Sequence, residues 1–449
     1  MRPHRPETKP QLDLFRESLT AILNPRHELL VLASRIDWDG LEERFGATFV
    51  DDVGRPGLPT RLMVGLHLLK HIKALSDEAV CAVWVENPYF QAFCGETHFQ
   101  HVLPADRSSM TRWRKRMEVA DLEAMLAETV AIALSSGAAM PRQVERVTVD
   151  TTVQTKAVAH PTDGHLMLRA IEWLNRAAVK HNIPLRQSYL RVARHARREA
   201  ARLIHGRGHK QAKAHLRFMR TRLGRLLRDI KRKTADRPEV QVAIAPVLDR
   251  AGMIHVQKPG DRHKLYALHA PEVECIGKGK ARARYEFGVK ASFATTNERC
   301  KGGQFVLGAM ACPGRPYDGH TLERQIAQVA RVTGREVDRA YVDRGYRGHG
   351  IERNDAPRIV ISHTRGITSP TIKRELARRN AIEPVIGHMK QDGLLERNHL
   401  KAEHGDAINV IFCAIGHNMR LLLAWFRALL CAILCIVFAT SNRHRMLKI

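Results

Sequence analysis

The chain has 449 residues, of which 44% are hydrophobic, so it is long enough for two or three domains with a sizeable core and is not an intrinsically disordered protein. Its 73 Lys and Arg residues exceed its 46 Asp and Glu residues and give a formal net charge of +27. Such an excess favours a polyanionic partner, most often a nucleic acid, over a membrane surface.

The cysteines and the apolar runs indicate a cytosolic protein. The eight cysteines form no C-x-x-C pair and no secretory signal precedes them, so we expect reduced, mostly buried thiols. The apolar run from Ala428 to Thr440 is shorter than the roughly 18 to 20 residues that a spanning helix needs. Arg420 and Arg427 interrupt its upstream extension, so we expect a buried or partner-docking helix and no membrane partner.

Helical periodicity dominates from Leu58 to Met117. The stretch LPTRLMVGLHLLKHIKAL has apolar residues at helical spacing, and Ser76 is expected to cap the next helix, which Asn87-Pro88 ends. Ser108 or Ser109 is expected to cap a third helix, SSMTRWRKRMEV. This third helix carries four candidate DNA-binding residues, Arg112, Arg114, Lys115 and Arg116. A helix-turn-helix-like DNA-binding module and a plain helical bundle with a solvated basic face explain the pattern about equally well.

The pattern changes to strands at ERVTVDTTV, where Val147, Val149, Thr151 and Val153 alternate with other residues. Further strands are expected at YEFGVKASFATT, QFVLGAMAC, EVDRAYV and RIVIS, with a helix that ends at Gly334 after the third strand and a helical region after the fifth. This order of elements resembles the ribonuclease-H-like fold, in which three antiparallel strands precede a helix and further parallel strands.

A long helical insertion separates the first two predicted strands. From Arg191 to Lys233 it has sixteen Lys or Arg residues and two acidic ones. An apolar stripe at helical spacing would pack this segment against a core; its members are Leu223, Leu226, Leu227 and Ile230. We interpret its basic face as a clamp for phosphates, the alternative being a solvated helical hairpin. The candidate phosphate contacts are Arg217, Arg220, Arg225 and Arg228.

Three acids stand out by position. Asp150 lies in the first strand and Asp343 directly follows the fourth, and these two strands would be neighbours in a ribonuclease-H-like sheet. Glu383 lies in the late helical region, with Arg379 before it and Lys390 after it. Clustered carboxylates repel unless a cation separates them, and hard oxygen ligands suit Mg²⁺ or Mn²⁺. Two such ions, about 4 Å apart, can activate water in phosphodiester cleavage.

In this interpretation Asp150, Asp343 and Glu383 are catalytic metal ligands, while Arg379 and Lys390 bind DNA phosphates. The alternative for Arg379, Glu383 and Lys390 is a surface ion-pair ladder on one helix face. Because Pro384 disfavours a helical residue before it, the helix must kink there or begin there. Glu383 is chosen over Glu375 because it has apolar neighbours, whereas basic neighbours surround Glu375 and predict a local exposed ion pair.

These motifs resemble those of the DDE transposases of bacterial insertion sequences, most closely the IS-five family and its IS-four relatives. The matching stretches are DTT at Asp150, the strand YEFGVK from Tyr285, and D-R-G-Y-R-G from Asp343. Arg379, Glu383 and Lys390 match the last three positions of the family pattern Y-x2-R-x3-E-x6-K, but Leu376 replaces its tyrosine. The resemblance spans roughly residues 54–423.

The resemblance implies an α/β protein with a domain layout that we state as residue ranges. A partly helical extension at 1–57 and a helical DNA-binding domain at 58–140 precede a ribonuclease-H-like catalytic domain at 141–425, with the basic insertion at about 160–280 and an apolar helix and tail at 426–449. It implies a bacterial, nucleoid-associated transposase that uses Mg²⁺ or Mn²⁺. This enzyme would act on terminal inverted repeats and target DNA as at least a dimer. A catalytically inactive DNA-binding derivative and a nuclease without strand transfer remain alternatives.

Overall fold

The computed structural model describes residues 17–46, 57–277, 284–351, 357–364 and 369–446. The chain divides into two compact units, which are treated separately below. The first comprises Met1–Gln154 with Lys290–Ile449, and the second comprises Thr155–Val289.

The first unit begins with helices whose ends follow local capping rules. Ser76 accepts a hydrogen bond from the Ala79 amide at 3.0 Å and caps α5 as predicted, and Asn87 caps a new helix that starts at Pro88. The third predicted helix is capped by Asp106, not by Ser108 or Ser109, because the Asp106 carboxylate accepts from the Ser108 amide at 2.8 Å. The helices are α1 (Leu19–Ile22), α2 (Glu28–Ala33), α3 (Trp38–Gly46), α4 (Thr60–Ile72), α5 (Asp77–Glu86), α6 (Pro88–Phe93), α7 (Arg107–Arg114), α8 (Val119–Ser135) and α9 (Pro141–Val144).

A mixed sheet follows, with strand order β2-β3-β1-β5-β6 and β4 paired to β3. The pairs β2–β3 and β3–β4 are antiparallel, whereas β1–β5 and β5–β6 are parallel. All five predicted strands are present, and the first and fourth are neighbours as expected; β2 was not predicted. The strands are β1 (Arg146–Thr155), β2 (Glu274–Gly277), β3 (Tyr285–Thr296), β4 (Val306–Cys312), β5 (Arg339–Val342) and β6 (Arg358–Ile361).

Helices and short 3-10 turns complete the first unit. The predicted helix after β4 ends at Gly334, which adopts φ 64° and so uses the left-handed conformation that glycine tolerates. The elements are α14 (Asp318–Thr333), η1 (Arg344–Tyr346), α15 (Pro370–Ala377), η2 (Arg378–Ala381), α16 (Ile382–Asp392) and α17 (Ala402–Met446).

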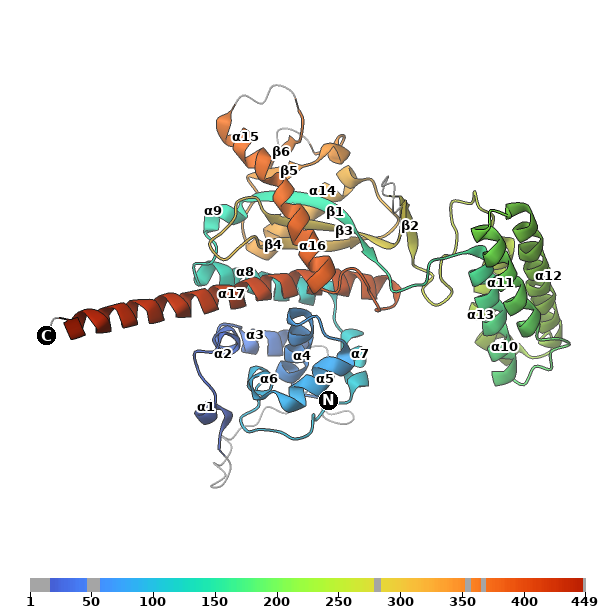
Figure 1. The fold of residues 1–449 in the computed structure, drawn as a ribbon, viewed down its shortest axis with the longest axis horizontal. Helices are drawn as coiled ribbons and strands as arrows, with labels where there is room; N and C mark the ends of the chain where they lie inside the picture. The colour runs from blue at the N-terminus through green and yellow to red at the C-terminus, as the bar shows by residue number, and fades with distance from the viewer. Residues whose placement is uncertain (1–16, 47–56, 278–283, 352–356, 365–368, 447–449) are drawn as a thin grey trace. The chain divides into compact units, whose positions relative to one another are not determined.

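Helix α17 joins the helical and sheet parts of this unit into one core. It packs on α4 and α8 and against β4, and its course beside α8 can be followed in Figure 1. Asn418 of α17 donates to Thr129 of α8 at 2.9 Å and exchanges hydrogen bonds of 2.8 Å with the backbone of Val306 in β4. Gly416 lies so close to α4 that a Cβ there would be 2.7 Å from the His71 carbonyl oxygen.

The apolar C-terminal run is more exposed than its composition predicts. Leu429 and Ile433 are exposed, and so are Cys431 and Cys435, whereas the buried part of α17 lies upstream. Within the described residues, the span 402–433 of this helix is long and apolar enough to cross a membrane, but 78% of its most apolar window is buried inside the protein. A core helix meets the same criterion.

Three histidines of this unit, His67, His71 and His417, are buried and are called the buried histidines below. Burial lowers the pKa of His67 to about 3 and that of His417 to about 4, and it places the pKa of His71 well below the usual value. All three are therefore neutral at pH 7.

The second unit contains four helices, α10 (Asp163–Lys180), α11 (Leu190–His205), α12 (His209–Lys233) and α13 (Pro238–Val256), around their own apolar core. The predicted apolar stripe is confirmed, since its four members on α12 are buried. On the other face of α12, Arg217, Arg225 and Arg228 are exposed. Arg220 is half-buried and donates to the Gln257 carbonyl at 3.3 Å, so part of its donor capacity serves the fold.

Candidate active site

Asp150 and Asp343 occupy equivalent places on two adjacent strands. Parallel pairing sets Thr148 of β1 opposite Tyr341 of β5, and each aspartate lies two residues further along its strand direction. The Asp150 carboxylate accepts from the Thr151 amide at 2.8 Å, and the Asp343 carboxylate accepts from the Gly345 amide at 2.8 Å and caps η1. The two predicted aspartates therefore lie on neighbouring strands, just beyond the last paired residues of β1 and β5.

A third aspartate, Asp318, joins them. A Cβ on Gly345 would lie 3.0 Å from an Asp343 carboxylate oxygen and 3.3 Å from an Asp318 oxygen, so both carboxylates flank this glycine. Asp318 starts α14 and accepts hydrogen bonds from Thr151 Oγ1 at 2.9 Å and Lys290 Nζ at 2.8 Å. Sequence analysis did not select Asp318. The signal that could have pointed to it is Lys290 of the YEFGVK strand, which is its hydrogen-bond partner.

Burial, and secondly the neighbouring carboxylates, make the environment of Asp150 unfavourable for its charge. Burial raises the pKa of Asp150 to about 6; the Arg379 guanidinium opposes this rise, while Asp343 and Asp318 add to it. Tyr346 is buried beside them, and its hydroxyl has no hydrogen-bond partner among the described residues. Burial raises the pKa of Tyr346 well above 10, with the three aspartates adding to the rise. A bound cation would relieve this concentration of negative charge.

Glu383 lies in the first turn of α16, and its side chain is 66% exposed. Arg379 connects it to the aspartates, because one guanidinium nitrogen is 3.8 Å from an Asp150 oxygen and 3.9 Å from a Glu383 oxygen. The apolar neighbours for which Glu383 was chosen do not bury it: Ile382 and Val385 are buried while the glutamate is exposed. As Pro384 requires, the helix begins anew, at Ile382 after the 3-10 turn η2.

Glu375 is the buried glutamate of this region, which corrects its prediction as a local exposed ion pair. It is 4% exposed and accepts from Arg146 of β1 at 2.9 Å, from Arg339 of β5 at 2.8 Å and from the Tyr341 hydroxyl. Its partners come from strands rather than from its own helix. Glu375 therefore ties α15 to the sheet.

The donor set suits a divalent cation only in part. Asp150 and Asp343 supply hard oxygen ligands, and burial, with Asp343 and Asp318 adding to it, raises the pKa of Asp150. Among the described residues, however, no three His, Cys, Asp or Glu side chains are grouped closely enough to hold one ion. Glu383 reaches the aspartates through Arg379 and not directly. Lys390 is half-buried in the last turn of the same helix.

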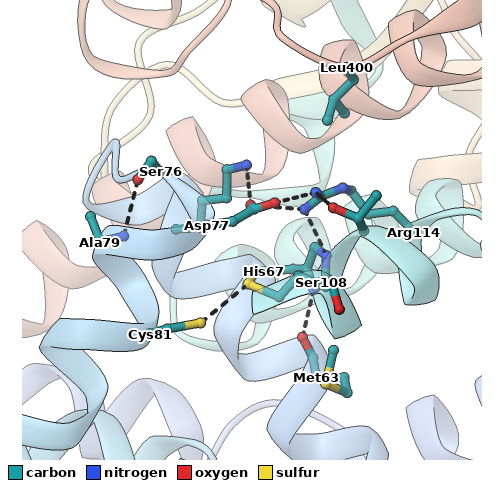
Figure 2. Close-up of polar contacts among 12 residues, drawn as sticks. Met63, His67, Ser76, Asp77, Ala79, Cys81, Ser108, Arg114 and Leu400 are labelled. Atoms are coloured by element: carbon teal, nitrogen blue, oxygen red, sulfur yellow. Dashed lines mark hydrogen bonds and ion pairs between the residues drawn. The ribbon is translucent and has the colours of Figure 1, made fainter. Parts of the chain in front are cut away.

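The predicted DNA contacts on α7 and directly after it divide into two kinds. Arg112, Lys115 and Arg116 are exposed, but Arg114 is buried. Figure 2 shows Arg114 directed at Asp77, whose carboxylate accepts two of its hydrogen bonds, one at 3.0 Å. Arg114 therefore stabilises the contact between α7 and α5 in this conformation, which corrects its prediction as a DNA contact.

His67 and Lys70 of α4 complete this network. Lys70 donates to the Asp77 carboxylate at 2.7 Å. Arg114 lies 3.3 Å from Nε2 of His67, and Nδ1 of His67 lies 2.7 Å from the Met63 carbonyl oxygen. Because the guanidinium can only donate, the neutral His67 must carry its proton on Nδ1. Two cations thus pair with the half-buried Asp77, and the neutral His67 lies against one of them, Arg114.

Comparisons with known proteins show which family the chain belongs to. Residues 17–116 match the model of a family described as "Transposase domain (DUF772)". The chain is 54% identical over 207 residues, which are 46% of this chain and 99% of the relative, to the "Uncharacterized protein ORF8 in nfe locus" of Rhizobium meliloti. No solved structure matches the chain. The chain therefore belongs to the same family as the Rhizobium meliloti ORF8 protein, and its residues 17–116 carry a transposase-family domain.

Proposed function

We propose that this protein is the transposase of a bacterial insertion sequence. It binds the terminal inverted repeats of its element, nicks their ends with water and joins the freed 3′-hydroxyls to target DNA. The observation that carries the proposal is the placement of Asp150 and Asp343 at matching positions of adjacent parallel strands, with Arg379 joining Asp150 to Glu383. The transposase-family domain supports it independently.

The proposal includes a ribonuclease-H-like catalytic domain. Its support is the strand order: β4 and β3 run antiparallel beside β1, helix α14 follows, and β5 and β6 extend the sheet in parallel on the other side of β1. In such a sheet β1 and β5 are neighbours, and polar groups where these two strands end face a common substrate.

Mg²⁺ or Mn²⁺ is the proposed cofactor: Asp150 and Asp343 would hold the ions, and Glu383 would be the third ligand. Such ions would supply the positive charge that activates water and stabilises the leaving oxygen. Around them, Lys290 and Thr151 hold Asp318 in place by hydrogen bonds. The Arg379 guanidinium, placed between Asp150 and Glu383, neutralises the site before DNA arrives and can then bind a phosphate.

Double-stranded DNA is the proposed partner, and two chains hold the two ends of an element. In the second unit, called the basic unit below, the exposed Arg217, Arg225 and Arg228 are the proposed phosphate contacts. The proposed location is the bacterial cytoplasm at the nucleoid. An inactive DNA-binding derivative is the second candidate, favoured by the exposure of Glu383 and by the lack of a three-residue ligand group among the described residues.

The deciding experiment uses purified protein and duplexes that carry the sequences flanking its gene. We expect end cleavage with Mg²⁺ and none with a chelator. Asp343→Asn should remove cleavage and leave binding nearly intact, because an amide is a poorer Mg²⁺ ligand of similar shape. Asp236→Asn, at an exposed position of the basic unit, is the matched control. Binding without cleavage by the unaltered protein would support the inactive derivative instead.

A further inference from the structure

A groove of about 850 Å³ lies in the first unit between the α5–α7 region and the segment 394–409. Figure 2 shows part of it, with Asp77 and Arg114 on one side and Leu400 on the other. Four of the exposed side chains along it are Lys115, Arg397, His399 and Lys401. None of these four makes a side-chain hydrogen bond or ion pair with another described residue, so all four can bind a ligand.

The acidic residue deepest in the groove does not offset these charges. Asp77 lies between Arg114 and Lys70, which donate to its carboxylate, so its charge is already compensated within the wall. Glu78 is the other acid of the lining. With Lys115, Arg397 and Lys401 counted as well, cationic side chains outnumber acids by five to two. The groove is therefore electropositive and suits an anion.

The groove connects to the strand that carries Asp150. Asn409 in its lining donates to Gln154 of β1 at 2.8 Å, and Gln154 donates to the Asp406 carbonyl at 3.2 Å. Asp150 and Gln154 are four residues apart on this strand and so face the same side of the sheet, about 13 Å from each other. That separation is within the reach of one duplex, whose phosphates follow each other along the backbone.

We propose that this groove binds the phosphate backbone of duplex DNA next to the phosphodiester presented to Asp150 and Asp343, an assignment that rests on the proposed function. The residues that line it include no Phe, Tyr or Trp, so it offers no stacking platform of the kind that single strands use. Its exposed cations on flexible side chains suit phosphates, which position a duplex without reading its sequence. Lys115 contacts one side of the backbone, and Arg397 and Lys401 contact the other.

The test compares two triple variants that remove equal charge. The groove variant is Lys115→Gln, Arg397→Gln and Lys401→Gln. The control is Arg35→Gln, Arg142→Gln and Lys301→Gln, at exposed positions of the same unit away from the groove. Affinity for a fluorescein-labelled 30-base-pair duplex of random sequence is measured by anisotropy, in chelator and from about 0.1 to 0.4 M salt. A single strand of the same length is measured in parallel.

The slope of log K against log salt should flatten by about 0.9 per lost contact, or about 2.7 for the groove variant. Each contact then contributes roughly 8-fold at 0.1 M salt, so duplex affinity should fall about 500-fold, with little change in the control. Hydrogen exchange of the unaltered protein should also show duplex-dependent protection of peptides covering 107–118 and 394–405. This second readout does not depend on the variants folding.

Equal losses in both variants, or no protection of those peptides, would overturn the assignment. A loss confined to the single strand would overturn the choice of duplex. Because all binding is measured without divalent ions, its outcome is separate from that of the proposed function. If duplex affinity depends on the groove but the protein never cleaves, the groove assignment stands and the transposase function is rejected.

Discussion

Glu375→Gln and Glu383→Gln make the same chemical change eight residues apart, and the structure predicts opposite consequences. Glu375 is buried under Arg146, Arg339 and the Tyr341 hydroxyl, whereas Glu383 is 66% exposed and pairs with Arg379 at 3.9 Å. We therefore expect Glu375→Gln to lower the free energy of unfolding, and Glu383→Gln to leave folding intact while abolishing cleavage and strand joining.

The magnitudes follow from burial. Removing one partner of a buried ion pair typically costs 3–5 kcal/mol, roughly, because the opposite charge stays buried alone. Arg146 and Arg339 retain partial exposure and can turn to Asp338, which lies 3.7 and 3.1 Å from them, so the lower end applies to Glu375→Gln, about 3 kcal/mol. The exposed pair of Glu383 contributes about 0 to 1 kcal/mol, so its loss barely changes stability.

Urea unfolding followed by circular dichroism measures the first effect, and cleavage of end-containing duplexes in Mg²⁺ measures the second. Each variant serves as the control for the other because the substitution is identical. Wild-type stability of the Glu375 variant would refute its role in tying α15 to the sheet. Strand joining by the Glu383 variant would refute its place in the active site.

Three further outcomes are expected. Arg114→Ala should destabilise the first unit by about 3 kcal/mol, seen as an earlier urea midpoint, because Asp77 loses a buried partner; an unchanged midpoint would show that the network is dispensable. The pKa values of the buried histidines are lowered by folding, so the unfolded chain binds more protons below pH 6.5, and stability should fall between pH 6.5 and 4 by about 1.4 kcal/mol per pH unit for each histidine. A melting temperature that does not fall between pH 6.5 and 4 would contradict this prediction. Neutralising Arg217, Arg225 and Arg228 to Gln should flatten the salt dependence of duplex binding by about 0.9 per contact, and an unmoved slope would leave the basic unit as a solvated face.

The strands and the aspartate pair could be predicted from the sequence because their signals are local. The alternation around Asp150 lies within β1, and the apolar run before Asp343 lies within β5. The parallel pairing of β1 with β5 then follows from the element order. The short strand β2 gave no such signal, since its four residues follow a segment of irregular structure.

The roles of the glutamates and of Arg114 could not be predicted, because their partners are distant in sequence. Arg146 lies 229 residues from Glu375, and Asp77 lies 37 residues from Arg114. Apolar neighbours also misled the choice for Glu383: adjacent residues on a helix point about 100° apart, so a buried Ile382 says little about the residue after it. Burial of a charge is a property of the assembled fold.

The position of α17 in the chain sets the order in which the protein can be completed on the ribosome. Helices α4 and α8 pack on α17, whose buried face extends to Phe426, about 290 residues after the end of α8 at Ser135. At about 5–20 residues per second, the early helices wait roughly 15 to 60 s with an apolar face uncovered. A nascent chain in that interval is a client for chaperones. We therefore expect that a chain that stops before Ala402 leaves the N-terminal helices without their partner and cannot form the groove or the aspartate pair described above.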